Sequence, residues 1–318
     1  MAFREKMSNA HPLLKGVLWL GLMGLLFVVS MAAYVLYVRL TGVQSVLELK
    51  MAQLVQSVMV FVVPSLLAVW CWSSRPSEWL RLRAVGNGWV YVLIVMLMIV
   101  SQPGINMLAT WNEGIRLPAF MSELEQHFQD MEASARELTE MLAAAPTIGA
   151  LLLNLIVLAA VPAIGEELTF RGVVLGLTDG DTTLGPRTSP TLRTHLAVWA
   201  VGIIFSLIHF QFYGFIPRML LGVVLGYLLV WTGSLWAPMA AHFTNNALVV
   251  LLYFAEEHFS INSESLESFG TGTTSWAGWL SLLLSLLLLW LVRNAVQQQS
   301  SAPHPAGPPV SPYRPCEF

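Results

Sequence analysis

Eight apolar stretches follow one another along this chain, and they limit its fold more than any other feature of the sequence. Several have about the 20 residues that a helix needs to cross the hydrocarbon core of a bilayer. Only 11% of the 318 residues are charged and the mean hydropathy is +0.65, which excludes an ordinary soluble globule. We therefore expect an all-α, polytopic membrane helix bundle with about eight transmembrane segments, near residues 16–38, 54–72, 88–109, 147–171, 195–210, 215–232, 235–254 and 276–292.

The distribution of basic residues predicts how this bundle lies in the membrane. If the amino terminus is cytoplasmic, eleven of the sixteen Lys and Arg residues fall on the cytoplasmic side of the predicted spans. Because Lys and Arg are in excess in cytoplasmic loops, we expect both termini to be cytoplasmic, in a multi-pass protein of a bacterial plasma membrane. The net charge of −3 and the lack of a lysine-rich stripe argue against a nucleic acid partner.

Composition divides the chain into four parts. Residues 1–146 hold the first spans and, at 112–145, an acidic amphipathic stretch whose apolar residues recur at helical intervals. We expect a helix outside the membrane there, either simply solvated or acting as a lid that gates a substrate. Residues 147–254 form the predicted catalytic core, 255–297 a loop and the last transmembrane helix, and 298–318 a Pro- and Ser-rich disordered tail.

Two acids and an arginine stand near the end of the fourth apolar stretch. Insertion of one ionised side chain near the middle of a membrane helix costs roughly 2.5 to 3.5 kcal/mol, so Glu166, Glu167 and Arg171 need partners or a function. Glu167 and Arg171 are spaced i and i+4, which places their side chains on one helix face. Glu166 points about 100° away. The spacing therefore predicts one paired carboxylate and one that is free to take a proton from water.

Further polar residues interrupt the later apolar stretches. His209 closes one of them, and His242 with Asn246 one turn later lies inside another. Pro162 and Pro238 each stand four residues before an active group, Glu166 and His242, and we expect both prolines to kink their helices. Any one of these polar residues is also compatible with plain packing between helices. Their joint occurrence in three spans predicts a buried catalytic site.

The order of these residues resembles a known family. The patterns EExxxR, FxxxH and HxxxN follow one another in adjacent apolar stretches, as they do in the CAAX protease and bacteriocin-processing (Abi) family of intramembrane endopeptidases, which includes Ras-converting enzyme. The resemblance covers about residues 147–254. The residues that carry it are Glu166, Glu167, Arg171, Phe205, His209, His242 and Asn246.

The resemblance implies hydrolysis of a peptide bond inside a helical membrane bundle. It makes Glu166 the base that activates water, with His209 assisting. His242 and Asn246 would stabilise the oxyanion of the tetrahedral intermediate, and Glu167 with Arg171 would brace the site. The substrate would be a lipidated or membrane-embedded protein or peptide, reached from membrane lipid.

The cofactor and the class of activity stay open at this point. Two imidazoles and a carboxylate also suit a catalytic zinc ion held by Glu166, His209 and His242, although the chain has no HExxH motif. A metal-free glutamate mechanism uses the same residues. The alternatives from other classes are a catalytically silent scaffold or immunity protein of the same fold and a transporter with a proton or cation relay. No inverted repeat pairs the two halves, which disfavours the transporter.

Overall fold

The computed structural model describes residues 2–42, 45–179, 187, 189–259 and 261–301, and within these ranges all regular structure is helical. This confirms the predicted all-α class. In chain order the elements are α1 Ala2–Ser8, α2 Pro12–Thr41, α3 Val46–Ser57, η1 Val58–Val62, α4 Val63–Trp72, α5 Pro76–Trp79, α6 Gly88–Val100, α7 Gln102–Glu113, η2 Ala119–Met121, α8 Ser122–Ala143, α9 Ile148–Asn154, η3 Leu155–Ala160, α10 Val161–Glu167, η4 Leu168–Val174, α11 Leu175–Asp179, α12 Leu192–Leu207, α13 Phe215–Thr232, α14 Trp236–Phe259, α15 Ser263–Glu267, η5 Gly272–Thr274 and α16 Ser275–Ser301.

The chain is a multi-pass integral membrane protein. Among the described residues, five continuous helices are long and apolar enough to cross a bilayer, and α6 with α7, bent by 42°, forms a sixth candidate. The helix α12 is apolar but shorter. Each of the eight predicted stretches therefore overlaps a helix or the bent pair α6 and α7, although α12 ends at Leu207 and His209 lies in the turn beyond it. The number of crossings and the side of each terminus stay predictions. The five helices run over Pro12–Thr41, Val46–Trp72, Ile148–Thr178, Phe215–Thr232 and Gly272–Gln298.

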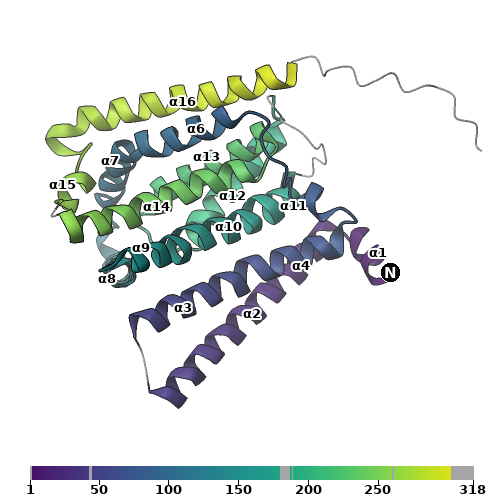
Figure 1. Cartoon of the computed structure of the whole chain (residues 1–318), viewed down its shortest axis with the longest axis horizontal. Helices are drawn as coiled ribbons and strands as arrows, with labels where there is room; N and C mark the ends of the chain where they lie inside the picture. The colour runs from purple at the N-terminus through teal and green to yellow at the C-terminus, as the bar shows by residue number, and fades with distance from the viewer. Residues whose placement is uncertain (1, 43–44, 180–186, 188, 260, 302–318) are drawn as a thin grey trace, which may run out of the picture.

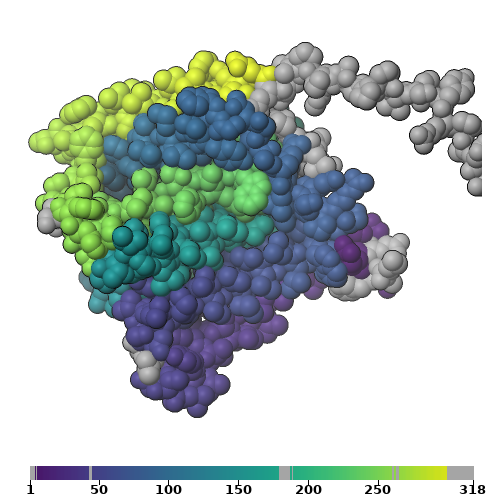
Figure 2. Space-filling model, in the orientation of Figure 1, coloured from purple at the N-terminus to yellow at the C-terminus, as the bar shows by residue number. Residues whose placement is uncertain are grey.

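The long helices lie side by side, with α13 and α14 between outer layers (Figure 1). The α2–α3 hairpin forms one flank and α16 the other, and the hairpin protrudes from the surface in Figure 2. Two clusters of buried apolar side chains hold the layers together. One gathers residues of α4, η4, α12, α13 and α14, and the other gathers residues of α6, α13, α14 and α16. Because α13 and α14 each contribute to both clusters, they form the centre of the bundle.

Two glycines let α12 and α13 cross at short range. A Cβ atom built on Gly202 would lie 2.7 Å from a methyl carbon of Val223, and one built on Gly222 would lie 3.0 Å from the Cα atom of Gly202. Small residues at such crossings allow the backbones of membrane helices to approach closely. The crossing brings the backbone of α13 within reach of side chains from the helix that carries Glu166.

Three stretches have π-helical hydrogen bonding, and two of them directly precede a helical proline. The segment η1 comes before Pro64, and η3 comes before Pro162. The wider π-helical turn accommodates proline, which lacks a backbone N–H. Such turns are frequent at functional sites. The segment η3 makes the hydrogen bonding irregular before Pro162, although Ile148–Thr178 continues as one helix, and the kink predicted there stays a prediction. The kink predicted at Pro238 is wrong, because α14 begins at Trp236 and proline is tolerated in a first turn.

The acidic stretch and the tail differ in part from their predicted bounds. The acidic stretch at 112–145 contains α8, whereas its first two residues belong to α7; its place outside the membrane stays a prediction. Residues 298–301 of the predicted tail at 298–318 are helical, because α16 continues to Ser301, and residues 302–318 lie outside the described part of the chain. The described chain ends, at α1 and α16, lie at the same end of the bundle (Figure 1).

Candidate active site

Glu167 and Arg171 form a buried ion pair one helical turn apart. Arg171 Nη1 donates to Glu167 Oε1 over 2.7 Å, and both side chains are fully buried. Arg171 Nη2 also donates to the backbone carbonyl of Gly222 on α13, over 2.8 Å. The pairing predicted from the i, i+4 spacing is confirmed. Because both charges are removed from water, each depends on the other for compensation.

The same carboxylate oxygen holds His242 on α14. His242 Nδ1 lies 2.8 Å from Glu167 Oε1. Since an ionised carboxylate only accepts hydrogen bonds, Nδ1 carries a proton and donates it to Glu167. The other ring nitrogen, Nε2, lies 3.9 Å from Glu166 Oε2. Glu167 thereby orients an imidazole whose second nitrogen faces Glu166.

Glu166 points away from the ion pair that its neighbour forms. Its side chain is 14% exposed, and its Oε2 atom is buried without a hydrogen-bond partner among the described residues. Buried polar atoms without a hydrogen-bond partner are rare in native structures and often mark a functional site. This oxygen lies beside the His242 ring, and its unused capacity to accept a hydrogen bond suits a water molecule or a reacting group.

Phe205 forms an aromatic wall between the two histidines. His209 Nδ1 donates to the Phe205 carbonyl oxygen over 2.7 Å, so its proton is on Nδ1 and Nε2 is left as an acceptor. The Phe205 ring lies 5.2 Å from the His209 ring and 5.7 Å from the His242 ring, edge to face in both cases. The Arg171 guanidinium lies over the same ring at 4.8 Å. The sequence identified Phe205 only as part of a pattern, whereas the structure places it at the centre of the cluster.

Asn246 is the predicted residue that the structure does not join to the others. It lies one turn beyond His242 on α14, and its Oδ1 accepts a hydrogen bond from Asn245 Nδ2 over 3.3 Å. Within the described part of the chain it has no hydrogen bond to Glu166 or His209. Its role at the oxyanion stays a prediction.

The predicted zinc ligands do not form a complete set in this arrangement. Among the described residues, no group of three or more His, Cys, Asp or Glu side chains is placed so that it could hold a metal ion. Glu166 and His242 face each other, whereas His209 packs its ring against Phe205 and is not grouped with them. The donor geometry therefore does not fit a zinc ion held by these three residues.

Polar and aromatic contacts join α8 to the loop that carries His209, and the sequence alone did not reveal them. Gln211 Nε2 donates to Glu132 Oε1 over 3.2 Å, and Arg218 Nη2 donates to Gln211 Oε1 over 2.7 Å. Burial raises the pKa of the Glu132 carboxyl, and the nearby Arg218 guanidinium opposes this rise. Phe128 stacks on Phe212 with ring centroids 5.0 Å apart. Glu132 and Gln211 are 79 positions apart in the sequence, so the spacing of neighbouring residues does not predict such contacts.

Two adjoining hollows open between α8 and this loop. The larger, of about 530 Å³, has apolar walls, and the second, of about 430 Å³, has His209 in its wall. Met131, Phe210 and Gln211 line both. An apolar hollow thus leads to one of the predicted catalytic side chains.

Comparison with known proteins finds a family that is similar to part of the chain. Residues 148–248 match the family model described as type II CAAX prenyl endopeptidase Rce1-like. The chain is also similar to the uncharacterized protein YpbD of Bacillus subtilis (strain 168), with 31% identity over 99 residues. That alignment covers 30% of this chain and 43% of YpbD. No solved structure matches the chain.

The matched segment begins at the first residue of α9 and ends within α14. It therefore holds the ion pair, the unpartnered Glu166 carboxylate and both histidines. Residues 148–248 of the chain are thus similar to the Rce1-like family of CAAX prenyl endopeptidases, which is a family of proteases.

Proposed function

We propose that this protein is an intramembrane endopeptidase that hydrolyses a peptide bond in a lipidated or membrane-embedded protein. One observation carries the proposal: the buried Oε2 atom of Glu166 has no partner among the described residues and faces an imidazole that Glu167 orients. A free carboxylate oxygen beside a fixed imidazole is the arrangement that general base catalysis requires.

In the proposed reaction, Glu166 takes a proton from a water molecule while the water oxygen attacks the carbonyl carbon of the substrate. The tetrahedral intermediate then collapses, the bond between carbon and nitrogen breaks, and the proton held by Glu166 passes to the leaving amine. His209 assists through Nε2, because its Nδ1 is committed to the Phe205 carbonyl. Because the Glu166 carboxylate and the attacking water are held next to each other, a base as weak as a carboxylate can take the proton.

His242 and Asn246 are proposed to stabilise the oxyanion. To donate toward that oxygen, His242 Nε2 must carry a proton while Nδ1 still donates to Glu167. Glu167 Oε1, 2.8 Å from Nδ1, then holds the ring in its orientation. Donors aimed at the charge that develops in the transition state are commonly the largest contribution to catalysis.

We propose that the apolar hollow beside α8 receives the lipid chain or the apolar side chains of the substrate. Its walls include Phe128, Met131 and Leu207, and its neighbour reaches His209. Burial of apolar area is the main favourable contribution to binding in such a site. The substrate would then be held with its scissile bond toward Glu166.

The change Met131→Trp tests this assignment, because a larger side chain fills a wall that both hollows share. We expect KM for a quenched farnesylated peptide to rise about tenfold, as loss of burial for about two methylene groups implies, with a smaller change in kcat. The measurement is steady-state cleavage of this peptide and of the same peptide without the lipid.

Met141→Trp is the matched control, since Met141 lies on the same helix and is exposed. We expect it to leave both substrates unaffected. An equal rise in KM for the two Met variants, or for the lipidated and the plain peptide, would show that the hollow does not hold the lipid.

Removal of metal ions is expected to leave cleavage unchanged. The proposed base needs no ion, and the described side chains offer no set of three ligands. The measurement is metal analysis of the purified protein in detergent, paired with peptide cleavage before and after chelation. Stoichiometric zinc, with activity lost on chelation and restored by added metal, would instead make Glu166, His209 and His242 ligands.

A further inference from the structure

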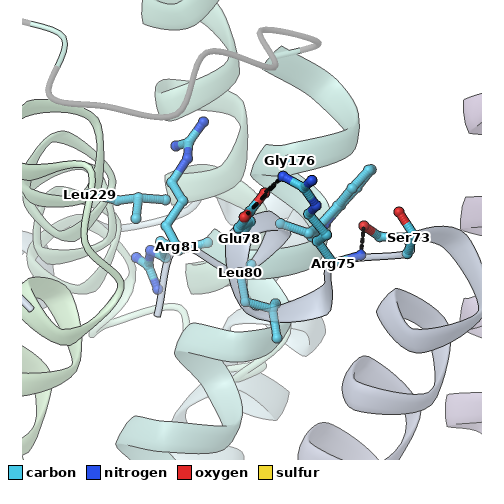
Figure 3. A pocket seen from close by; sticks show the side chains of 11 residues that line it. Ser73, Arg75, Glu78, Leu80, Arg81, Gly176 and Leu229 are labelled. Atoms are coloured by element: carbon cyan, nitrogen blue, oxygen red, sulfur yellow. Dashed lines mark hydrogen bonds and ion pairs between the residues drawn. The ribbon is translucent and has the colours of Figure 1, made fainter. Parts of the chain in front are cut away.

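A second hollow, of about 230 Å³, opens at the end of the bundle where the chain passes from α4 to α6. Its lining includes Arg75, Glu78 and Arg81 together with Gly176 and Leu229, and Figure 3 shows Arg75 and Glu78 paired beside it. An adjoining hollow of about 290 Å³ shares Glu78 and Arg81 and adds Arg83 to its wall. Neither hollow includes Glu166 or a histidine, and Arg171 in the wall of the first is the only residue that they share with the candidate active site.

The rim of these hollows carries an excess of positive charge. Three arginines face one carboxylate, and the pair between Arg75 and Glu78, 3.3 Å apart, is largely exposed to solvent. Clusters of basic residues at the ends of membrane helices attract anionic lipid head groups.

Two hydrogen-bond donors of the residues that line the first hollow lack an acceptor. Arg171 Nε and Trp79 Nε1 are buried and have no hydrogen-bond partner in the described part of the chain. The Arg171 residue is only 1% exposed. A buried donor without an acceptor lowers the stability of the folded protein. An anion with several oxygen atoms, bound in this hollow, would supply the missing hydrogen-bond acceptors.

The position of the hollow selects the kind of anion. Residues 73–87 connect a helix that is long and apolar enough to cross a bilayer with the bent pair formed by α6 and α7. This is where a membrane surface meets the bundle, and Trp with Arg is typical of that depth. We propose that the hollow binds the phosphate group of an anionic phospholipid, with Arg75 and Arg81 on its rim and Arg171 and Trp79 as internal donors.

Binding there would also reach the site described above, although the proposal does not depend on catalysis. Arg171 already donates Nη1 to Glu167 and Nη2 to Gly222. A phosphate oxygen accepting from Nε would complete the hydrogen bonding of the guanidinium. We therefore expect the bound lipid to raise the unfolding temperature of the protein.

The test uses the full chain, purified in a neutral detergent. Its thermal unfolding midpoint is measured with increasing phosphatidylglycerol, with phosphatidylcholine, and with inorganic phosphate alone. We expect phosphatidylglycerol to raise the midpoint in a saturable way and phosphatidylcholine to leave it unchanged. A weaker response to inorganic phosphate supports a lipid site. An equal response to the free ion would support the anion site and overturn the lipid as its occupant.

The double variant Arg75→Gln with Arg81→Gln should weaken the response to phosphatidylglycerol by about fivefold for each arginine removed. The matched control, Arg39→Gln with Arg193→Gln, removes the same charge at two exposed positions outside the hollow and should respond as the unchanged protein does. If the double variant fails to fold, Arg75→Gln alone, at an exposed position, serves in its place. Equal responses in variant and control, or an equal effect of phosphatidylcholine, would overturn the proposal.

Discussion

Replacement of Glu166 by glutamine is expected to lower kcat/KM for peptide cleavage by about 10² to 10⁴, the usual contribution of a general base. Glutamine has nearly the same shape as glutamate but does not accept a proton at neutral pH. The fold should persist, because Glu166 forms no ion pair with Arg171 and its Oε2 atom has no hydrogen-bond partner in the described structure. The measurement is cleavage of the quenched farnesylated peptide, with the unfolding curve recorded in parallel.

Glu137→Gln is a suitable control, because Glu137 is exposed on α8 and remote from the predicted catalytic residues in sequence. It should cleave the peptide at the unchanged rate. Activity retained in the Glu166→Gln protein would contradict the assignment of the base. If neither the unchanged protein nor any variant cleaves such peptides, the scaffold alternative gains support, and a partner that binds the unchanged and Glu166→Gln proteins equally would identify it.

Removal of the Glu167 carboxylate is expected to have the largest effect on stability. The change Glu167→Leu leaves Arg171 buried, fully shielded and without its counter-ion, which typically costs 3 to 5 kcal/mol. His242 Nδ1 loses its acceptor as well. The free energy of unfolding, measured by denaturation in mixed micelles, should fall by about this amount, while cleavage well below the unfolding temperature falls less than in Glu166→Gln.

The double variant Glu167→Leu with Arg171→Met separates charge from packing. Buried ion pairs replaced by apolar residues of similar size are often close to neutral in stability, so the double variant should be more stable than Glu167→Leu alone. A double variant that is as unstable as the sum of the two single changes would mean that the two residues do not compensate each other.

Local spacing predicted the parts of the site that lie within one helix. The i, i+4 rule placed Glu167 against Arg171, and the rotation of one residue set Glu166 apart from them. Apolar runs of bilayer length placed the helices themselves. These predictions succeed because a helix fixes the geometry of neighbours in sequence.

Contacts between helices escaped prediction. The bond from His242 to Glu167 joins residues 75 positions apart, and that from Arg171 to Gly222 joins residues 51 positions apart. The spacing of residues within one helix does not determine which turns of two different helices come into contact. The π-helical stretches were also not foreseen, since a helical pattern does not reveal the change from one hydrogen-bond register to the next. The predicted kink at Pro238 failed for a related reason, because the sequence does not fix the first residue of α14 to within a turn.

The glycine crossing of α12 and α13 has a mechanical consequence. Side chains from Val223 and Phe205 fill the space beside Gly202 and Gly222, so neither helix has room to slide along the other, and Arg171 fastens the same point to η4. These three elements should move as one rigid body during turnover. The element that moves to admit a long substrate is then expected to be α8. Its ring stack between Phe128 and Phe212 and its hydrogen bond between Glu132 and Gln211 can break and re-form without the unwinding of any helix.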